Sequence, residues 1–141
     1  MTVSAQRAGR ISSVFLFALG LMDLVRGAAH TFFIHWANDT FAHLDLSANG
    51  PDQLMLLGAF GISNWLTGMV FILIALRARA LSDAALLIIL VAYALGWLGL
   101  KSAGISPDAD FNGRYIMFVY FGVCAVGLIW SYLDGKREIK T

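Results

Sequence analysis

The chain has 141 residues and a net charge of +1; 59% of its residues are hydrophobic and only 13% are charged. A soluble domain ordinarily has about 25% charged residues, and one of this size keeps too much surface exposed to hide so many apolar side chains from water. The composition therefore excludes an ordinary soluble globule and predicts that lipid covers much of the chain. Because no long basic stripe is present, nucleic-acid binding has no support. The single cysteine, Cys124, excludes an internal disulfide and a CxxC redox pair.

Four apolar runs are long enough to cross a bilayer, since a membrane helix needs roughly 20 mostly apolar residues. Residues typical of turns and helix caps, such as Asn-Gly-Pro and Ser-Pro-Asp, separate these runs. In chain order the runs are 11–36, 54–76, 84–104 and 115–133. We therefore predict an all-α integral membrane protein in which residues 1–141 form a single four-helix bundle.

The distribution of basic residues predicts how the four helices are oriented. Three segments would share one side of the membrane and contain seven basic residues: Arg7, Arg10, Arg77, Arg79, Lys136, Arg137 and Lys140. The first loop contains no Lys or Arg, and the third has them only at its ends, Lys101 and Arg114. Loops rich in Lys and Arg stay cytoplasmic, so both termini are predicted to lie inside. We expect a multi-pass protein of the bacterial inner (cytoplasmic) membrane.

The first run also permits a competing interpretation, as a cleaved secretory signal. Two arginines precede an apolar stretch, 14–22, and small residues follow it at 27–29. A membrane helix is favoured because polar Asp23 and Arg26 interrupt the stretch and apolar residues continue at 31–34.

A polar stripe marks the first helix as unusual. Asp23, Arg26 and His30 have the i, i+3, i+7 spacing that places side chains on one helix face. An Asp or Arg near the middle of a membrane helix costs roughly 3 kcal/mol. The two charges are therefore predicted to pair and to face the other helices, and ionisable residues inside a membrane usually have a function.

The other helices offer polar partners at a similar depth. Asn64 in the second helix and Tyr115 at the start of the fourth are predicted to face the stripe, with Trp65 close by. We expect a ligand pocket that opens to the outer side of the membrane. Its candidate residues are Asp23, Arg26, His30, Asn64 and Tyr115.

Two interpretations of the Asp23–Arg26 pair remain open at this level. The pair is either a structural clasp that holds the first helix to its neighbours or part of a ligand, proton or catalytic site. A buried ion pair contributes little net stability compared with apolar packing, which tilts the balance slightly towards function.

Two stripes of small residues predict close helix packing. Gly58, Gly61 and Gly68 form one on the second helix. Another, on the third helix, consists of Ala85, Ala92, Gly96, Gly99 and Ala103. Small residues let helix backbones approach each other. Packing within the chain is the favoured use of both stripes, and a dimer interface is the alternative.

A weaker pattern follows the first helix. His35, Asp39 and His43 are spaced four residues apart and would share a face if the helix continued. Two imidazoles and a carboxylate at that spacing can bind a divalent metal. Since Asn38 and Asp39 also resemble a helix stop, we do not predict a metal site here.

Three function classes are compatible with these residues. The first is a protein that binds or transports a small polar or anionic ligand, and arginine's suitability for anions favours it. The others are an accessory subunit of a larger membrane complex or homo-oligomer, and a membrane enzyme acting on a lipophilic substrate. Three histidines are too few for a His-rich di-iron site, and only His30 is placed to ligate a haem. No cofactor can be assigned.

Overall fold

We analysed a computed structural model of the chain, which describes the backbone of residues 3–105 and 112–138 and the side chains of 9–105, 112–134 and 136. These residues form helices and connecting loops and no strand. The α-helices are α1 (Val3–Phe32), α2 (Ile34–Ala37), α3 (Gly50–Arg77), α4 (Ser82–Ser102) and α5 (Gly113–Glu138). Two short segments complete the order, the π-helix Asn38–Ala42 after α2 and the 3-10 helix Arg79–Leu81 before α4.

The four long helices are apolar enough to cross a membrane, which confirms the predicted all-α fold with four candidate spans. The spans are Gly9–Phe32, Gly50–Arg77, Arg79–Ser102 and Gly113–Asp134. The first has a mean hydropathy of 1.6, against 1.9 to 2.0 for the others, yet it is the most buried, at 39%. The most polar helix is therefore also the one that its neighbours cover best.

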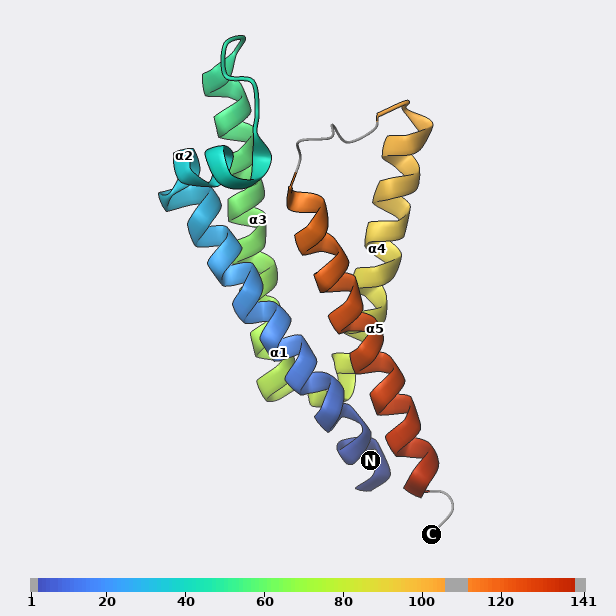
Figure 1. The fold of residues 1–141 in the computed structure, drawn as a ribbon. Helices are drawn as coiled ribbons and strands as arrows, with labels where there is room; N and C mark the ends of the chain where they lie inside the picture. The colour runs from blue at the N-terminus through green and yellow to red at the C-terminus, as the bar shows by residue number, and fades with distance from the viewer. Residues whose placement is uncertain (1–2, 106–111, 139–141) are drawn as a thin grey trace.

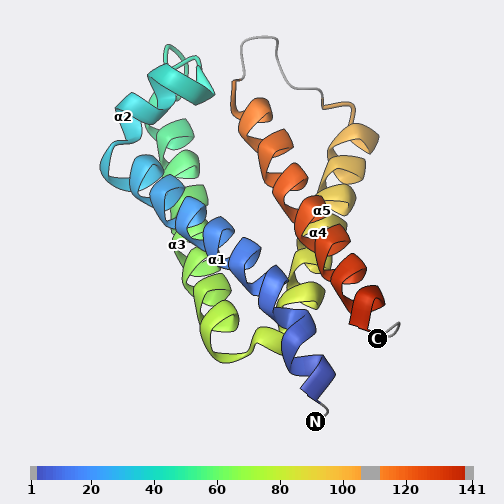
Figure 2. The ribbon, with the colours of Figure 1, turned by 60° about the horizontal axis from the view of Figure 1, so that its bottom comes forward.

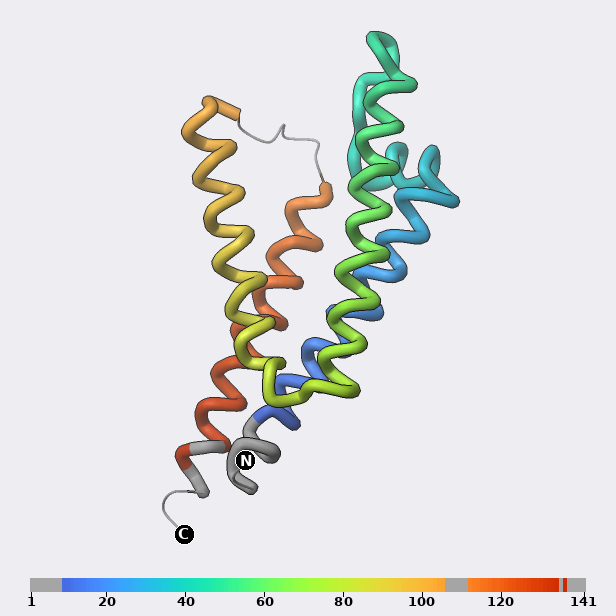
Figure 3. The backbone as a smooth tube through the Cα atoms, turned by 180° about the vertical axis from the view of Figure 1, so that it is seen from behind, coloured from blue at the N-terminus to red at the C-terminus, as the bar shows by residue number. Residues whose placement is uncertain are grey.

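α1 is the central helix of the bundle. It packs along α3 and also contacts α4 and α5. Figure 1 shows that α1 and α3 form one pair and α4 and α5 another; the pairs meet near the two termini and separate towards the opposite end. The same divergence is visible from below and from behind (Figures 2 and 3).

The apolar core lies where the two pairs meet. Its buried residues come from all four long helices and are Leu16, Leu19, Ala75, Ala85, Leu86, Ile89, Tyr120 and Cys124. By contrast, residues 94–102 of α4 and the residues 103–105 that follow it are exposed throughout, and only 11% of the span that contains α4 is buried. In a membrane that face is available to lipid.

Glycines set the close approach of α3 to α1, as the first small-residue stripe predicts. A Cβ added at Gly68 would lie 2.8 Å from the backbone oxygen of Gly20, and one at Gly61 would lie 2.8 Å from Cβ of His30. The second stripe behaves differently, because Gly96 and Gly99 have nothing within 4 Å of such an added atom. Packing within the chain thus accounts for the glycines on α3 but not for those in the C-terminal half of α4.

The first helix ends earlier than its apolar run, at Phe32 rather than at position 36. Phe33 leaves the helical conformation, with φ −120° and ψ 39°, and the chain then forms α2 and the π-helix. Buried Asn38 closes this turn by accepting a hydrogen bond from the backbone N–H of Leu44, at 3.0 Å. The helix therefore stops because the backbone turns at Phe33, although the sequence remains apolar.

The first loop leads into α3 through a polar turn. Asp45 accepts hydrogen bonds from the side chain and the backbone N–H of Ser47, and these hold the pKa of its exposed carboxyl below the usual value. Asn49 is left-handed, with φ 55°, and Pro51 lies in the first turn of α3. Proline is tolerated there because the first N–H groups of a helix have no partner within it. α3 therefore begins at Gly50, before its apolar run does.

Candidate functional site

Asp23 is the centre of a polar cluster that joins three helices. Asp23 is only 3% exposed. Oδ2 accepts hydrogen bonds from the hydroxyl of Thr67 on α3, at 2.9 Å, and from that of Tyr120 on α5, at 3.0 Å. Oδ1 faces the guanidinium of Arg26, one turn further along α1, at 3.5 Å. One buried carboxylate thus ties α1 to both α3 and α5.

Thr67 and Tyr120 are the two residues of this cluster that the sequence analysis did not single out. Thr67 lies three residues after Asn64, so it occupies the same face of α3 one turn on. Its hydroxyl also lies 3.1 Å from the carbonyl of Ser63, but a hydrogen bond to a carboxylate is the stronger of the two. Tyr120 is 2% exposed in the middle of an apolar run, and a buried tyrosine hydroxyl needs a polar partner. That need was the signal that could have identified it.

Arg26 is bound much less completely than Asp23. Its side chain is 13% exposed, and aromatic rings flank its guanidinium: Phe60 with its centroid at 5.3 Å and Tyr120 at 6.0 Å. A guanidinium has five N–H donors. Within the described residues its one hydrogen bond is the 3.5 Å contact with Asp23, which is at the long end of the range. Most of its donor capacity therefore has no partner among those residues.

His30 and Asn64 form a second polar contact, one turn of α1 beyond Arg26. Nδ2 of buried Asn64 lies 3.4 Å from Nδ1 of His30. The amide nitrogen can only donate, so this contact requires a neutral imidazole with its proton on Nε2. The His30 ring also packs against Phe60, with centroids 5.5 Å apart. Asn64 thus contacts His30, one of the residues of the polar stripe, and not the Asp23–Arg26 pair.

Contrary to the prediction, Tyr115 does not join this cluster. It is 57% exposed, and its hydroxyl accepts a hydrogen bond from neighbouring Arg114 at 3.2 Å. Five residues along a helix correspond to a rotation of about 140° and a rise of about 7.5 Å. Tyr115 therefore lies on a different face and level of α5 from Tyr120, which provides the hydroxyl in the cluster.

Trp65 lies in the contact between α1 and α3 and not at a pocket rim. Its ring covers Gly27, where an added Cβ would lie 3.0 Å from ring carbons. Its indole N–H donates to the hydroxyl of Thr31 at 3.3 Å. The indole is thus a packing element between the two helices.

The metal candidates His35, Asp39 and His43 do not form a site. They belong to three different conformations, in α2, in the π-helix and at a left-handed residue with φ 50°. Nε2 of His43 lies 3.3 Å from the amide nitrogen of Asn112. No group of three His, Cys, Asp or Glu side chains in the described part of the chain could hold a metal ion. The four-residue spacing has no meaning here, because the helix that would align the three residues ends at Phe32.

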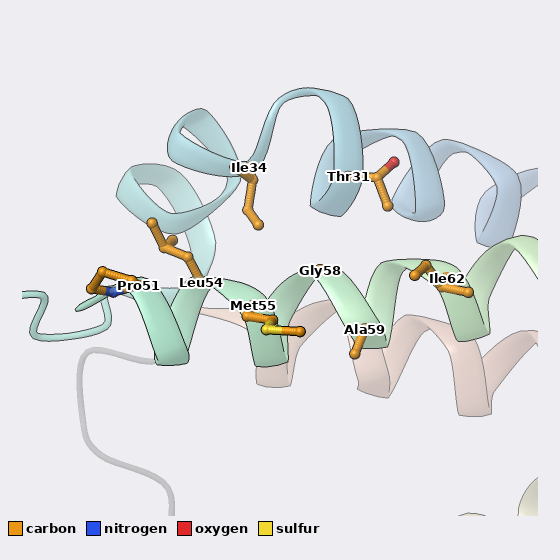
Figure 4. Close-up of a pocket in the computed structure, with 8 residues that line it drawn as sticks. All are labelled: Thr31, Ile34, Pro51, Leu54, Met55, Gly58, Ala59 and Ile62. Atoms are coloured by element: carbon orange, nitrogen blue, oxygen red, sulfur yellow. The ribbon is translucent and has the colours of Figure 1, made fainter. Parts of the chain in front are cut away.

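Two shallow grooves lie on the surface, and neither is lined by the cluster. The larger, of about 460 Å³, runs between the end of α1, α2 and the start of α3 (Figure 4). Its lining is mainly apolar and consists of Thr31, Ile34, Pro51, Leu54, Met55, Gly58, Ala59 and Ile62. The second, of about 370 Å³, lies along the end of α5 between Val126 and Asp134. Neither is the predicted pocket over Asp23, whose carboxylate is sealed by its partners.

Comparison with known proteins gives no match to a protein family, to a curated protein or to a solved structure. Function is therefore inferred from the chemistry of the cluster. Asp23 has two hydroxyl donors and a cation as partners, which is what a structural clasp between helices requires. Arg26 combines a permanent charge, partial exposure and N–H donors that have no partner among the described residues, so it can bind a further anionic partner.

Proposed function

We propose that this protein binds a small anionic ligand inside the helix bundle, with Arg26 as the residue that grips it. The proposal rests on the difference in hydrogen-bond partners between the two members of the ion pair. Asp23 accepts from three groups, whereas Arg26 makes one hydrogen bond of 3.5 Å among the described residues. A planar guanidinium matches the oxygens of a carboxylate or a similar planar anion with two parallel hydrogen bonds.

In this proposal the two interpretations of the pair apply to different residues. Asp23 is the clasp, because its bonds to Thr67 and Tyr120 link α1 to α3 and α5. It also provides the negative charge that lets a cation reside within the bundle in the absence of ligand. Arg26 is the ligand-binding residue, held from one side by Asp23 and flanked by Phe60 and Tyr120.

The ligand would reach Arg26 from the side of His30 and Asn64. These residues lie one turn nearer the first loop, the loop without Lys or Arg that faces outward in the predicted orientation. A neutral imidazole and a side-chain amide are suited to hydrogen-bond the far end of a polar ligand. We further propose that the membrane is the bacterial cytoplasmic membrane and that the site opens to its outer side.

The accessory-subunit and enzyme classes have weaker support. The exposed outer half of α4 suits lipid as well as it suits a partner helix. An enzyme would need a positioned acid or base beside bound substrate, and the carboxylate of Asp23 is enclosed by protein donors.

Calorimetric titration of the purified protein in lipid nanodiscs tests anion binding, with nitrate and acetate as planar probes. We expect the wild-type protein to bind at least one of them and Arg26→Gln to bind it roughly 10- to 100-fold more weakly. That range corresponds to the loss of a hydrogen bond to a charged group, about 1.5–3 kcal/mol. Helix content by circular dichroism checks that the variant is folded.

Lys101→Gln is the matched control. Lys101 is an exposed cation at the outer end of α4, with Nζ 4.9 Å from the Trp97 ring centroid. The Lys101→Gln substitution removes one positive charge at a position away from the cluster, so the affinity for the anion should not change. Binding that is lost equally in both variants would indicate general attraction to a cationic surface. Absence of binding by the wild-type protein would rule the proposal out for these planar anions.

A further inference from the structure

The cluster around Asp23 has balanced charge. Among the described residues, α1 contributes one carboxylate, one guanidinium and the imidazole of His30, which is neutral in its contact with Asn64. α3 contributes only the uncharged Thr67 and Asn64. The titratable groups that face the cluster from the other two helices are weak acids: Tyr120 and buried Cys124 on α5, and Tyr93 on α4, whose ring centroid is 6.1 Å from that of Tyr120.

A bound anion would disturb this balance. A monovalent ligand at Arg26 adds a second negative charge beside Asp23, in an interior where Coulomb interactions are much stronger than in water. Uncompensated charge inside a membrane protein is costly. One proton taken up together with the anion restores neutrality.

The two oxygens of Asp23 differ in their ability to hold that proton. Oδ2 already accepts from Thr67 and Tyr120, and these bonds do not involve Arg26. Oδ1 has only the 3.5 Å contact with Arg26 among the described residues. An anion competes for that guanidinium and leaves Oδ1 without a donor. A protonated Oδ1 becomes a donor itself and can hydrogen-bond to the anion that displaced it.

His30 is the alternative carrier, and its contacts argue against it. Its Nδ1 accepts from Asn64, so protonation at that nitrogen would break the contact. A charged imidazole would also lie one turn from the like charge of Arg26.

We propose that an anion bound at Arg26 is taken up together with one proton, which resides on Oδ1 of Asp23. The inference rests on the proposed anion site and adds the coupling. The balance is one anion and one proton added to a neutral ion pair, giving a neutral complex of protonated Asp23, Arg26 and the anion.

The pH dependence of anion affinity tests the coupling. The probe is nitrate or acetate, whichever binds more tightly, titrated between about pH 6.5 and about pH 8.5, where both remain ionised. Because the complex holds one more proton than the free protein, the Kd of wild type should rise roughly tenfold per pH unit. Calorimetry in two buffers of different ionisation enthalpy should independently give about one proton taken up per anion.

Two variants identify the carrier. Asp23→Asn keeps the two hydroxyl donors in contact with an acceptor oxygen and removes the titratable group, so its Kd should not vary with pH. Because His30 is proposed to contact the ligand, His30→Gln changes the affinity itself, but its Kd should keep the full tenfold dependence per pH unit. If Asp23→Asn does not fold, the slope of His30→Gln still distinguishes the two residues.

The outcomes separate this inference from the site on which it rests. No anion binding by wild type would remove both. Binding with a pH-independent Kd and no proton uptake would leave the anion site standing and overturn the coupling. Proton uptake that is lost in His30→Gln would overturn the assignment to Asp23.

Discussion

At the scale of single residues, the main polar feature of this bundle is the buried carboxylate of Asp23, which accepts hydrogen bonds from two hydroxyl groups. A charged residue in a membrane interior is normally paired and directed towards other helices. Asp23 meets that requirement with the hydroxyls of Thr67 and Tyr120 and the guanidinium of Arg26. Each hydroxyl comes from a different helix, so each bond adds to tertiary stability and not only to the stability of α1.

Replacing Tyr120 by Phe removes one of these donors and leaves the ring in place. We expect a loss of about 1 kcal/mol of unfolding free energy, the typical scale for a hydrogen bond between membrane helices. Equilibrium unfolding in mixed detergent micelles would measure it.

Tyr115→Phe is the matched control for that substitution. It makes the same chemical change on the same helix at an exposed ring, so its effect should be close to zero. If both variants lost the same stability, the hydrogen bond from Tyr120 to Asp23 would not be the cause.

At the scale of helices, the contact between α1 and α3 depends on glycines that face each other. At Gly68 an added Cβ would meet the carbonyl oxygen of Gly20 at 2.8 Å and Cδ2 of Leu24 at 2.9 Å. The leucine can adjust, but the oxygen belongs to a helix backbone and cannot move alone. The helices must therefore separate to accept even one methyl group, and this would also move Thr67 away from Asp23.

We accordingly expect Gly68→Ala to lower the unfolding free energy by about 1–3 kcal/mol, as overpacking of a close contact does. Thermal unfolding in detergent, followed by circular dichroism, would show this as a lower Tm.

Gly96→Ala is the control at the scale of the helix. Its added methyl group meets nothing within 4 Å, and alanine favours a helix over glycine by up to about 1 kcal/mol. Its Tm should stay the same or rise. If Gly96→Ala lowered the Tm as much as Gly68→Ala does, another helix or another molecule would have to cover this face of α4.

At the scale of the whole molecule, α1 connects two helix pairs that diverge from a common apolar core (Figure 1). Both termini lie at the end where the pairs meet. The basic residues Arg77, which ends α3, and Arg79, which begins the 3-10 helix before α4, belong to the connection between these helices. Figure 1 shows this connection at that same end. The first loop, without a Lys or Arg, lies at the end where the pairs diverge, which is therefore predicted to face outward.

Labelling with a membrane-impermeant maleimide on intact cells tests this orientation. In a Cys124→Ala background, Ala48→Cys should react directly, whereas Ala80→Cys should react only after the membrane is permeabilised. Both alanines are exposed and carry the same change, so they differ only in the side on which they lie. The reverse pattern would place the termini outside and the approach to Arg26 on the cytoplasmic side.

The sequence by itself determined the four apolar helices and the polar face of the first, because hydropathy and a 3.6-residue period are properties of a single segment. Only the tertiary structure decided which side chains complete the cluster. Tyr120 and Tyr115 lie on the same apolar helix, and a rotation of about 140° separates the one that meets Asp23 from the one that does not. Likewise, glycines on α3 pack against α1 while Gly96 remains open, although both stripes have similar spacing. The rotation and depth of one helix relative to another arise from the packing of the whole bundle, and no single segment encodes them.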